Sequence, residues 1–343
     1  MSDFAQSGLI CTLQRLNENH LANVEAELAN LARARPIALI LPCHGRDLEQ
    51  PAFARLIKEL RGADFLREIV LSVNEVSAEV AAALPDRLAS LPQRTTLLHN
   101  ESREGQRSGK GANVRHACAH LVGAGECEIV ATQDCDVASF RRADLARLCY
   151  AVAHPQLGYR FAKMYYSRVT DRLYGRVSRL FLAPLLHAIV RVAGHHPLVD
   201  FLLSFRYPLA GEVALTRELA AALPASDGWG LEIGQLCEVF RRVDPREVCQ
   251  VDGGPGYDHK HQPAATALAA MTAEIARELF AQLAAEGLAN DAGFHAAVAG
   301  AYRREAEHAL RRSASLALIN GLPFDEGAER AIVEAFAERL AAC

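Results

Sequence analysis

The sequence predicts an α/β fold with an open sheet and a helical C-terminal extension, and three observations support this. The run Ile37–Leu41 is continuously apolar, as expected for a strand buried on both faces. Between residues 37 and 131, such runs alternate with segments of helical period, which is typical of right-handed βαβ units. From about Ala265 onward the chain is rich in Ala, Leu, Glu and Arg and is almost entirely helical by period.

The first 131 residues contain the clearest strand and helix patterns. Residues 1–35 are expected to form a helical lead-in, because Leu and Ala recur at helical spacing from Leu21 to Leu31 before Pro36. The first strand, Ile37–Leu41, is expected to end at Pro42. The elements expected next are a helix over Phe53–Leu60, a strand over Glu68–Val73, a strand around Thr95–Leu98, a helix from Ser108 to about Leu121 and a strand over Cys127–Ala131.

Beyond residue 140 the pattern changes, and long helical stretches separate the remaining strands. The expected elements are a strand over Gly158–Arg168, a long helix over Leu173–Val192, a helix over Thr216–Leu223, a helix starting near Leu231 and a strand over Val248–Val251. We find no internal repeat and no low-complexity linker.

The composition is that of an ordinary globular protein. Of 343 residues, 50% are hydrophobic and 23% are charged, which is ample material for a core. The length suggests two domains, or one domain with an extension. A net charge of −4 argues against broad nucleic-acid binding. The nine cysteines include no CxxC pair, so we expect buried thiols rather than disulfides or a zinc site.

No stretch of the sequence predicts export or membrane insertion. The N-terminal segment carries Asp3 and Glu18 and lacks an apolar h-region, so we expect no signal peptide. The most apolar later stretch, residues 180–205, is interrupted by Pro184, Arg191 and Pro197, which makes it a poor membrane span. We therefore expect a cytoplasmic protein.

Two carboxylates follow the expected strand Cys127–Ala131. Asp134 and Asp136 are separated by one residue, so at the end of a strand they point to the same side. They would repel each other without a cation, and hard carboxylate oxygens suit Mg²⁺ or Mn²⁺. At the C-terminal edge of an open α/β sheet, a nucleotide-sugar pyrophosphate is expected at this point. The alternative interpretation is a solvated acidic turn.

A second element indicates phosphate binding. Gly109 and Gly111 flank Lys110 at the start of an expected helix, so the backbone and the helix N-terminus can approach an anion closely. The spacing is not that of a P-loop. The alternative is a flexible basic turn, because Arg103 and Arg107 lie nearby.

Six short motifs, taken in chain order, carry a family resemblance: Leu41–Pro42, Gly109–Gly111, Asp134–Asp136, Pro208–Glu212, Gly228–Glu232 and Asp258–His261. Together they resemble the motifs of the retaining GT-A glycosyltransferases that make glucosyl-3-phosphoglycerate, over roughly residues 37–262. The resemblance implies a Rossmann-like GT-A fold of the nucleotide-diphospho-sugar transferase type. It also implies transfer of glucose from a nucleoside-diphosphate glucose to the 2-hydroxyl of 3-phosphoglycerate, with retention at the anomeric carbon.

The resemblance implies a metal site and a donor site. Asp136 and His259 would hold a divalent cation, Mg²⁺ or Mn²⁺. Asp134 and Lys110 would contact the donor nucleotide. The further donor-binding positions implied are Pro42, Asn74, Leu209, Ala210 and Glu212.

The resemblance also implies an acceptor site and catalytic residues. The acceptor's phosphate and carboxylate would be held by Gly175, Arg176 and Ser178, with His261 nearby. A guanidinium suits bidentate capture of such an anion. The residues implied at the reaction centre are Glu232, Arg176 and Gly211.

The chain departs from the family pattern where the family binds the nucleotide base and ribose. Cys43–Arg46 stands where the family usually has Asn-Glu-Glu, and Ser72–Glu75 replaces its aspartate-serine pattern. These changes leave the donor base open between uridine and guanosine. His261 stands where an asparagine is usual, which leaves the acceptor open as well.

Two glutamates have alternative roles. Glu212 could cap the helix that follows it, and Glu232 lies in a first helical turn, where acidic residues are favoured. A retaining enzyme can use a carboxylate nucleophile, for which either would serve. A same-face displacement, in which the leaving phosphate takes the acceptor proton, also retains configuration, and the sequence leaves both mechanisms open.

The expected organisation has three parts. They are a helical lead-in over residues 1–35, a catalytic domain over 36–262 (donor half about 36–140, acceptor half about 141–262), and a helical region over 263–343 that could form a homodimer interface. The alternative functions are a related transferase that uses a mannose donor or D-glycerate, and a non-catalytic sugar-nucleotide-binding protein. A nucleotidyltransferase is disfavoured, because the expected loop after the first strand has the single glycine Gly45.

Overall fold

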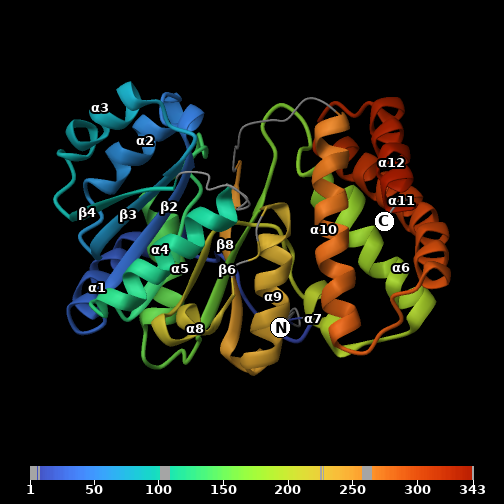
Figure 1. The fold of residues 1–343 in the computed structure, drawn as a ribbon, viewed down its shortest axis with the longest axis horizontal. Coiled ribbons are helices and arrows are strands. Elements are labelled where there is room, and N and C mark those ends of the chain that lie inside the picture. Colours follow the sequence, from blue (N-terminus) through green and yellow to red (C-terminus); the bar gives the residue numbers. More distant parts are fainter. Residues whose placement is uncertain are drawn as a thin grey trace.

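A mixed eight-stranded sheet forms the centre of the described chain, with the strand order β1-β8-β6-β7-β5-β2-β3-β4. The computed structural model describes residues 6, 8–100, 109–224, 226, 228–256 and 265–341. Figure 1 shows the sheet with helices on both faces and the last three helices, α10 to α12, beside it on the right.

The strands are β1 (Cys11–Leu13), β2 (Ile37–His44), β3 (Leu66–Asn74), β4 (Arg94–His99), β5 (Ile129–Thr132), β6 (Phe161–Ser167), β7 (Val213–Thr216) and β8 (Val248–Pro255). The helices of the sheet region are α1 (Leu21–Ala34), α2 (Pro51–Leu60), α3 (Ala78–Leu88), α4 (Lys110–Ala124), α5 (Arg142–Ala153), α6 (Ala183–Ala193), α7 (Pro197–Leu203), α8 (Arg217–Ala222) and α9 (Leu231–Arg242). The C-terminal helices are α10 (Ala265–Ala285), α11 (Ala292–Ile319) and α12 (Glu326–Ala341). The short helical turns are η1 (Glu18–His20), η2 (Gly45–Asp47), the π-helix η3 (Val177–Leu182), η4 (Gly228–Gly230) and η5 (Pro245–Glu247).

The buried strand β2 divides the core into two halves. Its side chains alternate across the sheet, so Ile37 and Leu39 enter one hydrophobic cluster while Ala38 and Ile40 enter the other. The first cluster is closed by α1, α2, α3 and α5, and the second by α4 and α6 to α12. A strand that is covered on both faces reads as a continuous apolar run, which is why the sequence predicted β2.

Strand β7 is the one reversed strand of the described sheet, because it pairs antiparallel with both β5 and β6 while the other neighbouring strands pair in parallel. The sequence analysis did not predict it and began a helix at Thr216 instead. Thr216 does cap α8, since its hydroxyl accepts a hydrogen bond from the backbone N–H of Leu219. An apolar run of four residues is too short for its hydrophobic period to show that it is a strand, and the period never shows the direction of a strand.

Two expectations about the first strand region were wrong. The lead-in over residues 1–35 is not wholly helical, because Cys11–Leu13 adds an edge strand that pairs with Cys249–Val251. Pro42 does not end β2, which continues to His44. Strand β5 pairs with β2 only as far as Ile40, so beyond that point β2 has one paired neighbour and tolerates a residue without an N–H.

The expected long helix over Leu173–Val192 begins later than predicted. Leu173 forms an isolated bridge with Val169, and Gly175 has a φ of 69°, a left-handed conformation that interrupts a helix. The helical segment therefore starts with η3 at Val177 and continues as α6. This places residues 173–176 in a loop, where their side chains can face the cleft described below.

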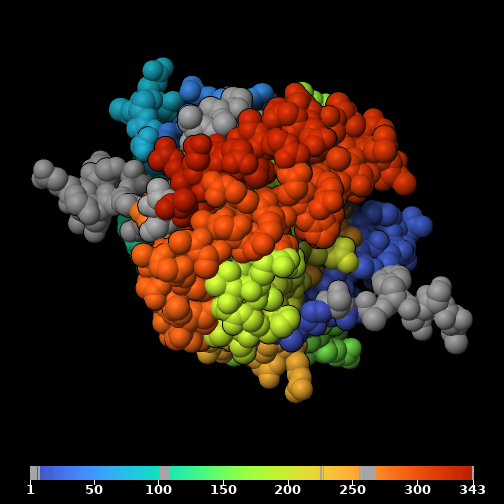
Figure 2. Space-filling view, turned by 90° about the vertical axis from the view of Figure 1, so that its right-hand side faces the viewer, coloured from blue at the N-terminus to red at the C-terminus, as the bar shows by residue number. Residues whose placement is uncertain are grey.

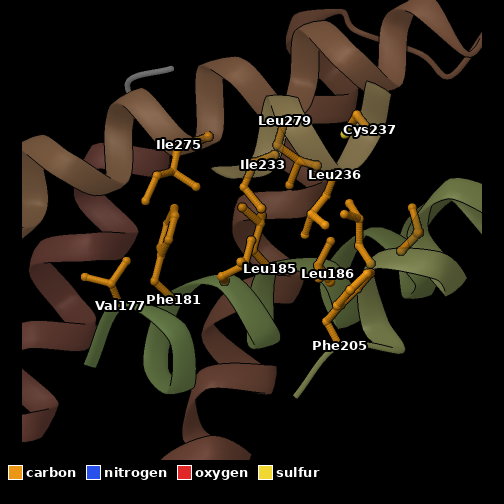
Figure 3. Close-up of a cluster of buried hydrophobic side chains, with 14 of the residues drawn as sticks. Val177, Phe181, Leu185, Leu186, Phe205, Ile233, Leu236, Cys237, Ile275 and Leu279 are labelled. Atoms are coloured by element: carbon orange, nitrogen blue, oxygen red, sulfur yellow. The ribbon is translucent and has the colours of Figure 1, made fainter. Parts of the chain in front are cut away.

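The C-terminal helices share one core with the sheet domain. The hydroxyl of the fully buried Tyr302 on α11 donates a hydrogen bond of 2.7 Å to the backbone oxygen of Leu180 in η3. Figure 3 shows Phe181 pointing from η3 toward Ile275 of α10, and Leu185 of α6 facing Ile233 of α9. In Figure 2 the helices α10 to α12 and the segment of α6 and α7 form one continuous face of the molecule. Helices α10 to α12 thus hold η3 in place.

Within the described ranges, no helix combines the length and the low polarity needed to cross a membrane. The eight described cysteines are free thiols, and six of them are buried, as expected.

A glycine at the end of β2 provides a test of how tightly this region is packed. A Cβ added at Gly45 would lie 2.1 Å from the backbone oxygen of Glu75, and backbone atoms cannot turn away from it. We expect Gly45→Ala to lower the free energy of unfolding by about 1–3 kcal/mol. The matched change Gly123→Ala, at an exposed position of α4 with no atom within 4 Å of the new Cβ, should raise it by about 0.5–1 kcal/mol. Urea unfolding of both variants checks this, and equal effects would contradict it.

Candidate active site

A cleft of about 1290 Å³ opens at the carboxyl ends of β2, β3 and β5. One wall is formed by the residues after these strands and by the start of α4. The opposite wall is formed by the loop before η3, and the start of α9 and helix α10 close the third side. The carboxyl edge of a mostly parallel sheet is where α/β proteins bind nucleotides. The cleft is therefore the candidate active site.

Asp134 and Asp136 both line the cleft, and the buried Cys135 between them borders it as well. The two carboxylates therefore reach the same cleft after β5. The buried Gln133 fixes the start of the turn, because its backbone N–H donates to the backbone oxygen of Ile40 at 3.1 Å. The two carboxylates are thus presented by a well-packed segment.

Lys110 lies between two carboxylates in the cleft. Its Nζ is 2.7 Å from Asp134 Oδ1 and 2.9 Å from Glu232 Oε1, although Glu232 is 122 residues away along the chain. Burial alone would lower the pKa of Lys110, but the negative charges of Asp134 and Glu232 outweigh it, so the pKa is well above its ordinary value. Lys110 is therefore a permanent cation at the start of α4, where an anion is also favoured by the helix N-terminus.

The backbone of Gly211 packs directly against the ion pair of Lys110 and Asp134. A Cβ at Gly211 would lie 2.3 Å from Lys110 Nζ and 2.7 Å from both carboxylate oxygens of Asp134. The backbone oxygen of Gly211 accepts a hydrogen bond of 2.6 Å from the hydroxyl of Thr132. Any larger residue at this position would push the two charged groups apart. Leu209 of the same loop lines the cleft.

Ala210 and Glu212 lie behind the cleft wall. Both have no exposed surface. Glu212 accepts a hydrogen bond of 2.9 Å from the hydroxyl of Tyr166 and one of 3.3 Å from Gln133 Nε2. It precedes β7 and does not cap a helix, so the capping alternative was wrong. These positions fit a supporting role for the Leu209–Gly211 loop rather than direct contact with a sugar. Glu232 does lie in the first turn of α9, as expected.

A fully buried lysine supports the same loop. Lys163 in β6 is 0% exposed, and its Nζ donates a hydrogen bond of 2.5 Å to the backbone oxygen of Ala210. Burial lowers the pKa of Lys163 to about 8, although the negative charge of Glu232 partly opposes the shift. We did not predict a role for Lys163 from the sequence. The feature that could have revealed it is its place as a lone lysine within the apolar run from Phe161 to Tyr166.

The wall formed by the loop before η3 carries three arginines. Gly175, Arg176 and Ser178, which the family resemblance assigns to acceptor binding, line the cleft there. Arg168 and Arg172, which the sequence analysis did not select, line it as well. Guanidinium groups on one wall make that side attractive to a small anion with several charges.

The end of the cleft formed by β2 and β3 contains a chain of amide hydrogen bonds. Asn113 Nδ2 donates to the backbone oxygen of Cys43 at 3.1 Å and to Asn74 Oδ1 at 2.8 Å. A backbone oxygen can only accept, so this bond fixes which way both amides are turned, and Asn74 keeps its NH₂ group as the donor. Pro42 lines the cleft beside it. His44, also at this end, contacts Glu75 with a distance of 2.9 Å from Nε2 to Oε2.

The expected metal ligands are only partly described. His259, the second expected ligand, lies outside the described residues, as does His261, which was expected near the acceptor. In the part of the chain that the structure describes, no group of three or more His, Cys, Asp or Glu is arranged to hold a metal ion. Asp136 offers a carboxylate to the cleft, and carboxylate oxygens fit a hard divalent cation.

The buried Lys163 predicts a pH-dependent stability. Its pKa is about 8 in the folded state, below the 10.5 that is ordinary for a lysine, so between these values the unfolded chain binds more protons. Stability then rises with pH, and we expect wild type to gain stability relative to Lys163→Met from pH 8 to about pH 10. Guanidinium unfolding at several pH values measures this. Lys58→Met, which removes an exposed lysine of α2, controls for the loss of a lysine, and a pH-independent difference for Lys163→Met would refute the prediction.

Comparison with known proteins gives a consistent set of relatives. No protein-family model matches the chain. The chain is 34% identical to the glucosyl-3-phosphoglycerate synthase of Persephonella marina over 358 residues, which covers 99% of this chain and 89% of the relative. It is 27% identical to the glucosyl-3-phosphoglycerate synthase of Methanococcoides burtonii, covering 90% of this chain and 81% of the relative.

Solved structures show the same fold. The glucosyl-3-phosphoglycerate synthase of Mycobacterium tuberculosis in complex with phosphoglyceric acid matches with a TM-score of 0.62 at 24% identity, covering 80% of this chain and 88% of that chain. The same enzyme with Mn²⁺, UDP-glucose and phosphoglyceric acid matches with a TM-score of 0.61 at 23% identity, with coverages of 80% and 87%. At this level of identity the likeness concerns the fold.

Proposed function

Because the chain belongs to the glucosyl-3-phosphoglycerate synthase family, we propose that it transfers glucose from UDP- or GDP-glucose to the 2-hydroxyl of 3-phosphoglycerate, with retention at the anomeric carbon. It is a glycosyltransferase with a GT-A fold. The observation that carries the proposal is the cleft itself. It sets the group of Lys110, Asp134 and Asp136 against a wall that carries Arg168, Arg172 and Arg176.

The donor side has the charges that a nucleoside diphosphate requires. Sugar transfer releases a diphosphate, and the charge that develops on it must be neutralised. Lys110 supplies a permanent cation, while Asp134 and Glu232 hold that cation in place. Asn74, whose NH₂ group is left as a donor by Asn113, suits a carbonyl oxygen of the base. Uracil and guanine both offer such an oxygen, so the base stays open.

A divalent cation, Mg²⁺ or Mn²⁺, belongs to the proposal. Asp136 would be its ligand from this wall, with His259 as the second ligand implied by the family resemblance. When bound, the cation supplies positive charge to the diphosphate. The M. tuberculosis enzyme was solved with Mn²⁺ or Mg²⁺ and UDP, which supports the same requirement here.

The acceptor side suits a phosphorylated three-carbon acid. Such an acceptor carries a phosphate and a carboxylate, and guanidinium groups bind both in bidentate fashion. Arg176 would bind the acceptor directly. D-Glycerate lacks the phosphate, so the arginine-rich wall favours 3-phosphoglycerate over it.

The positions of the two glutamates bear on how configuration is retained. Glu212 is fully buried and hydrogen-bonded by Tyr166 and Gln133, which makes it a poor nucleophile. Glu232 is paired with Lys110 and is better suited to holding that cation. We therefore favour the same-face displacement, in which the leaving phosphate takes the proton of the acceptor hydroxyl, over a covalent glycosyl-enzyme.

The test is a substrate panel. The protein is incubated with Mg²⁺ or Mn²⁺, with UDP-, GDP- or ADP-sugars, and with 3-phosphoglycerate or D-glycerate, and release of the nucleoside diphosphate is followed. NMR of the product gives the linkage and the anomeric configuration. Release that requires a glucose donor and 3-phosphoglycerate supports the proposal. A preference for a mannose donor or for D-glycerate would replace the proposed substrates, and no release with any pair would reject the reaction.

We propose that the catalytic domain spans residues 36–262 and that the C-terminal region over 263–343 contributes to a homodimer. Light scattering after size-exclusion chromatography measures the oligomeric state. The cytoplasmic location stays a prediction.

A further inference from the structure

The cleft arginine Arg176 is held by a carboxylate from the far end of the chain. Its Nε donates a hydrogen bond of 2.7 Å to Oε1 of Glu329, which lies on α12, 153 residues away. The side chain of Glu329 is 5% exposed, whereas that of Arg176 is 22% exposed and lines the cleft. A buried carboxylate thus accepts a hydrogen bond from Nε of an arginine that lines the candidate active site.

The same carboxylate also binds Arg179, which has a different environment. Arg179 donates to Glu329 Oε2, to the backbone oxygen of Tyr174 at 3.0 Å from Nε, and to the hydroxyl of Ser313 at 3.2 Å from Nη1. The hydrogen-bond donors of Arg179 are therefore used by acceptors within the protein. For Arg176, by contrast, the described residues provide a partner at Nε and none at its two Nη atoms.

We propose that Glu329 is a positioning residue for the acceptor: it holds Arg176 by Nε so that the two terminal nitrogens face the cleft and bind an anionic group of a small phosphorylated acid. The inference rests on the proposed function. It assigns to α12, beyond the expected catalytic domain, a direct part in building the acceptor wall.

The charge balance around Glu329 supports this role. Two guanidinium groups share one carboxylate, so the cluster of Arg176, Arg179 and Glu329 keeps one net positive charge. Because Arg179 has several protein acceptors, the uncompensated charge lies on the cleft side, at Arg176. A guanidinium anchored at one nitrogen loses less rotamer freedom when it binds an anion, which favours affinity.

The packing around the cluster keeps it rigid. Val177 and Phe181 follow Arg176 in η3 and point toward Ile275 of α10 (Figure 3). Tyr302 of α11 binds the backbone of Leu180. All three C-terminal helices therefore contact the segment that carries Arg176, and within the described residues Glu329 accepts the hydrogen bond of Arg176 itself.

The test compares the kinetics of Glu329→Gln with those of wild type. Glutamine keeps the shape but loses the charge and one of two strong acceptors. We expect the KM for 3-phosphoglycerate to rise about 10- to 30-fold, which is equivalent to ~1.4–2 kcal/mol, because the hydrogen bond that holds the charged guanidinium is weakened. The KM for the donor and kcat should stay within about 3-fold, and Glu329→Asp should recover part of the loss.

A matched control is available on helices α11 and α12. Glu307 of α11 pairs with Arg330 of α12 at 2.6 Å, but this ion pair is exposed. Glu307→Gln should leave the KM for both substrates unchanged. A role in stability alone would move the melting temperature of either variant without separating the KM of the acceptor from that of the donor.

A double-mutant cycle keeps the inference testable if Glu329→Gln is less stable. The affinity for 3-phosphoglycerate is measured by calorimetry in wild type, Glu329→Gln, Arg176→Gln and the double variant, well below their melting temperatures. If Glu329 acts through Arg176, its loss has no further effect once Arg176 is gone. Additive losses would overturn the inference, as would an unchanged or lower KM for the acceptor in Glu329→Gln. A wild-type protein inert toward every acceptor would overturn it together with the proposed function.

Discussion

Asp136→Asn is expected to lower kcat/KM by at least about 10³-fold and to abolish metal-dependent binding of the nucleoside diphosphate. Asp136 projects into the cleft from the turn after β5, next to the position at which the diphosphate is expected. Asparagine keeps the size of the side chain but removes the negative charge that a divalent cation requires. The measurement pairs steady-state kinetics with calorimetric titration of UDP in the presence and absence of Mn²⁺.

The control for this variant is Asp64→Asn, which changes an exposed aspartate before β3. It should leave both activity and nucleotide binding unchanged. Circular dichroism and melting curves establish that Asp136→Asn is folded. If Asp136→Asn keeps activity within 10-fold of wild type and still binds UDP in a Mn²⁺-dependent way, then Asp136 is not the metal ligand.

The fold was predictable from sequence where burial leaves a regular pattern. Strand β2 is covered on both faces, so it appears as the unbroken apolar run Ile37–Leu41, and β3 contains the shorter apolar run Ile69–Leu71. Strand β1 is only three residues long and pairs with Cys249–Val251, which are more than 230 residues away. Nothing local distinguishes it from a loop. Strand β7 was not predicted for a similar reason, because its direction is set by its neighbours β5 and β6 rather than by its own residues.

The candidate site was predictable where residues that are adjacent in sequence act together. Asp134 and Asp136 point to one side because a single residue separates them, and this needs only local geometry. The pairing of Lys110 with Glu232 depends on how two distant segments pack, and no local pattern predicts it. Arg176 was found through its motif, but its partner Glu329 lies in a helix with no motif at all.

The buried residues behind the cleft show a further limit of sequence reasoning. Glu212 stands in a recognisable loop motif, and a motif alone suggested contact with the donor. In the fold Glu212 is fully buried and accepts a hydrogen bond from Tyr166, so its position fits support of the loop rather than contact with the donor. Lys163 belongs to no motif, yet it donates a hydrogen bond to the backbone oxygen of Ala210 in the same loop. A charged residue in an apolar strand is the signal that merits attention.

Lys110→Met is expected to reduce both activity and stability. Methionine keeps the length of the side chain but removes the only described cation that contacts both Asp134 and Glu232. These two carboxylates are 18% and 11% exposed, so they would be left close together with little water to screen them. We expect the free energy of unfolding to fall by about 2 kcal/mol, less than the ~3–5 kcal/mol for a fully buried ion pair that loses one partner, because all three side chains keep some exposed surface. We expect kcat/KM to fall about 10³-fold, since the leaving diphosphate also loses its cation.

The repulsion between Asp134 and Glu232 in Lys110→Met allows its effect on stability to be measured separately from the loss of the cation that serves the diphosphate. In Lys110→Met, a second change of Glu232→Gln removes one of the repelling carboxylates, so it should restore part of the stability. It should not restore activity, because the cation for the diphosphate is still missing. Urea unfolding and the diphosphate-release assay, applied to both variants and to Lys58→Met as the control, give the two quantities independently. Recovery of activity in the double variant would show that Lys110 serves only to neutralise its neighbours and has no role toward the diphosphate.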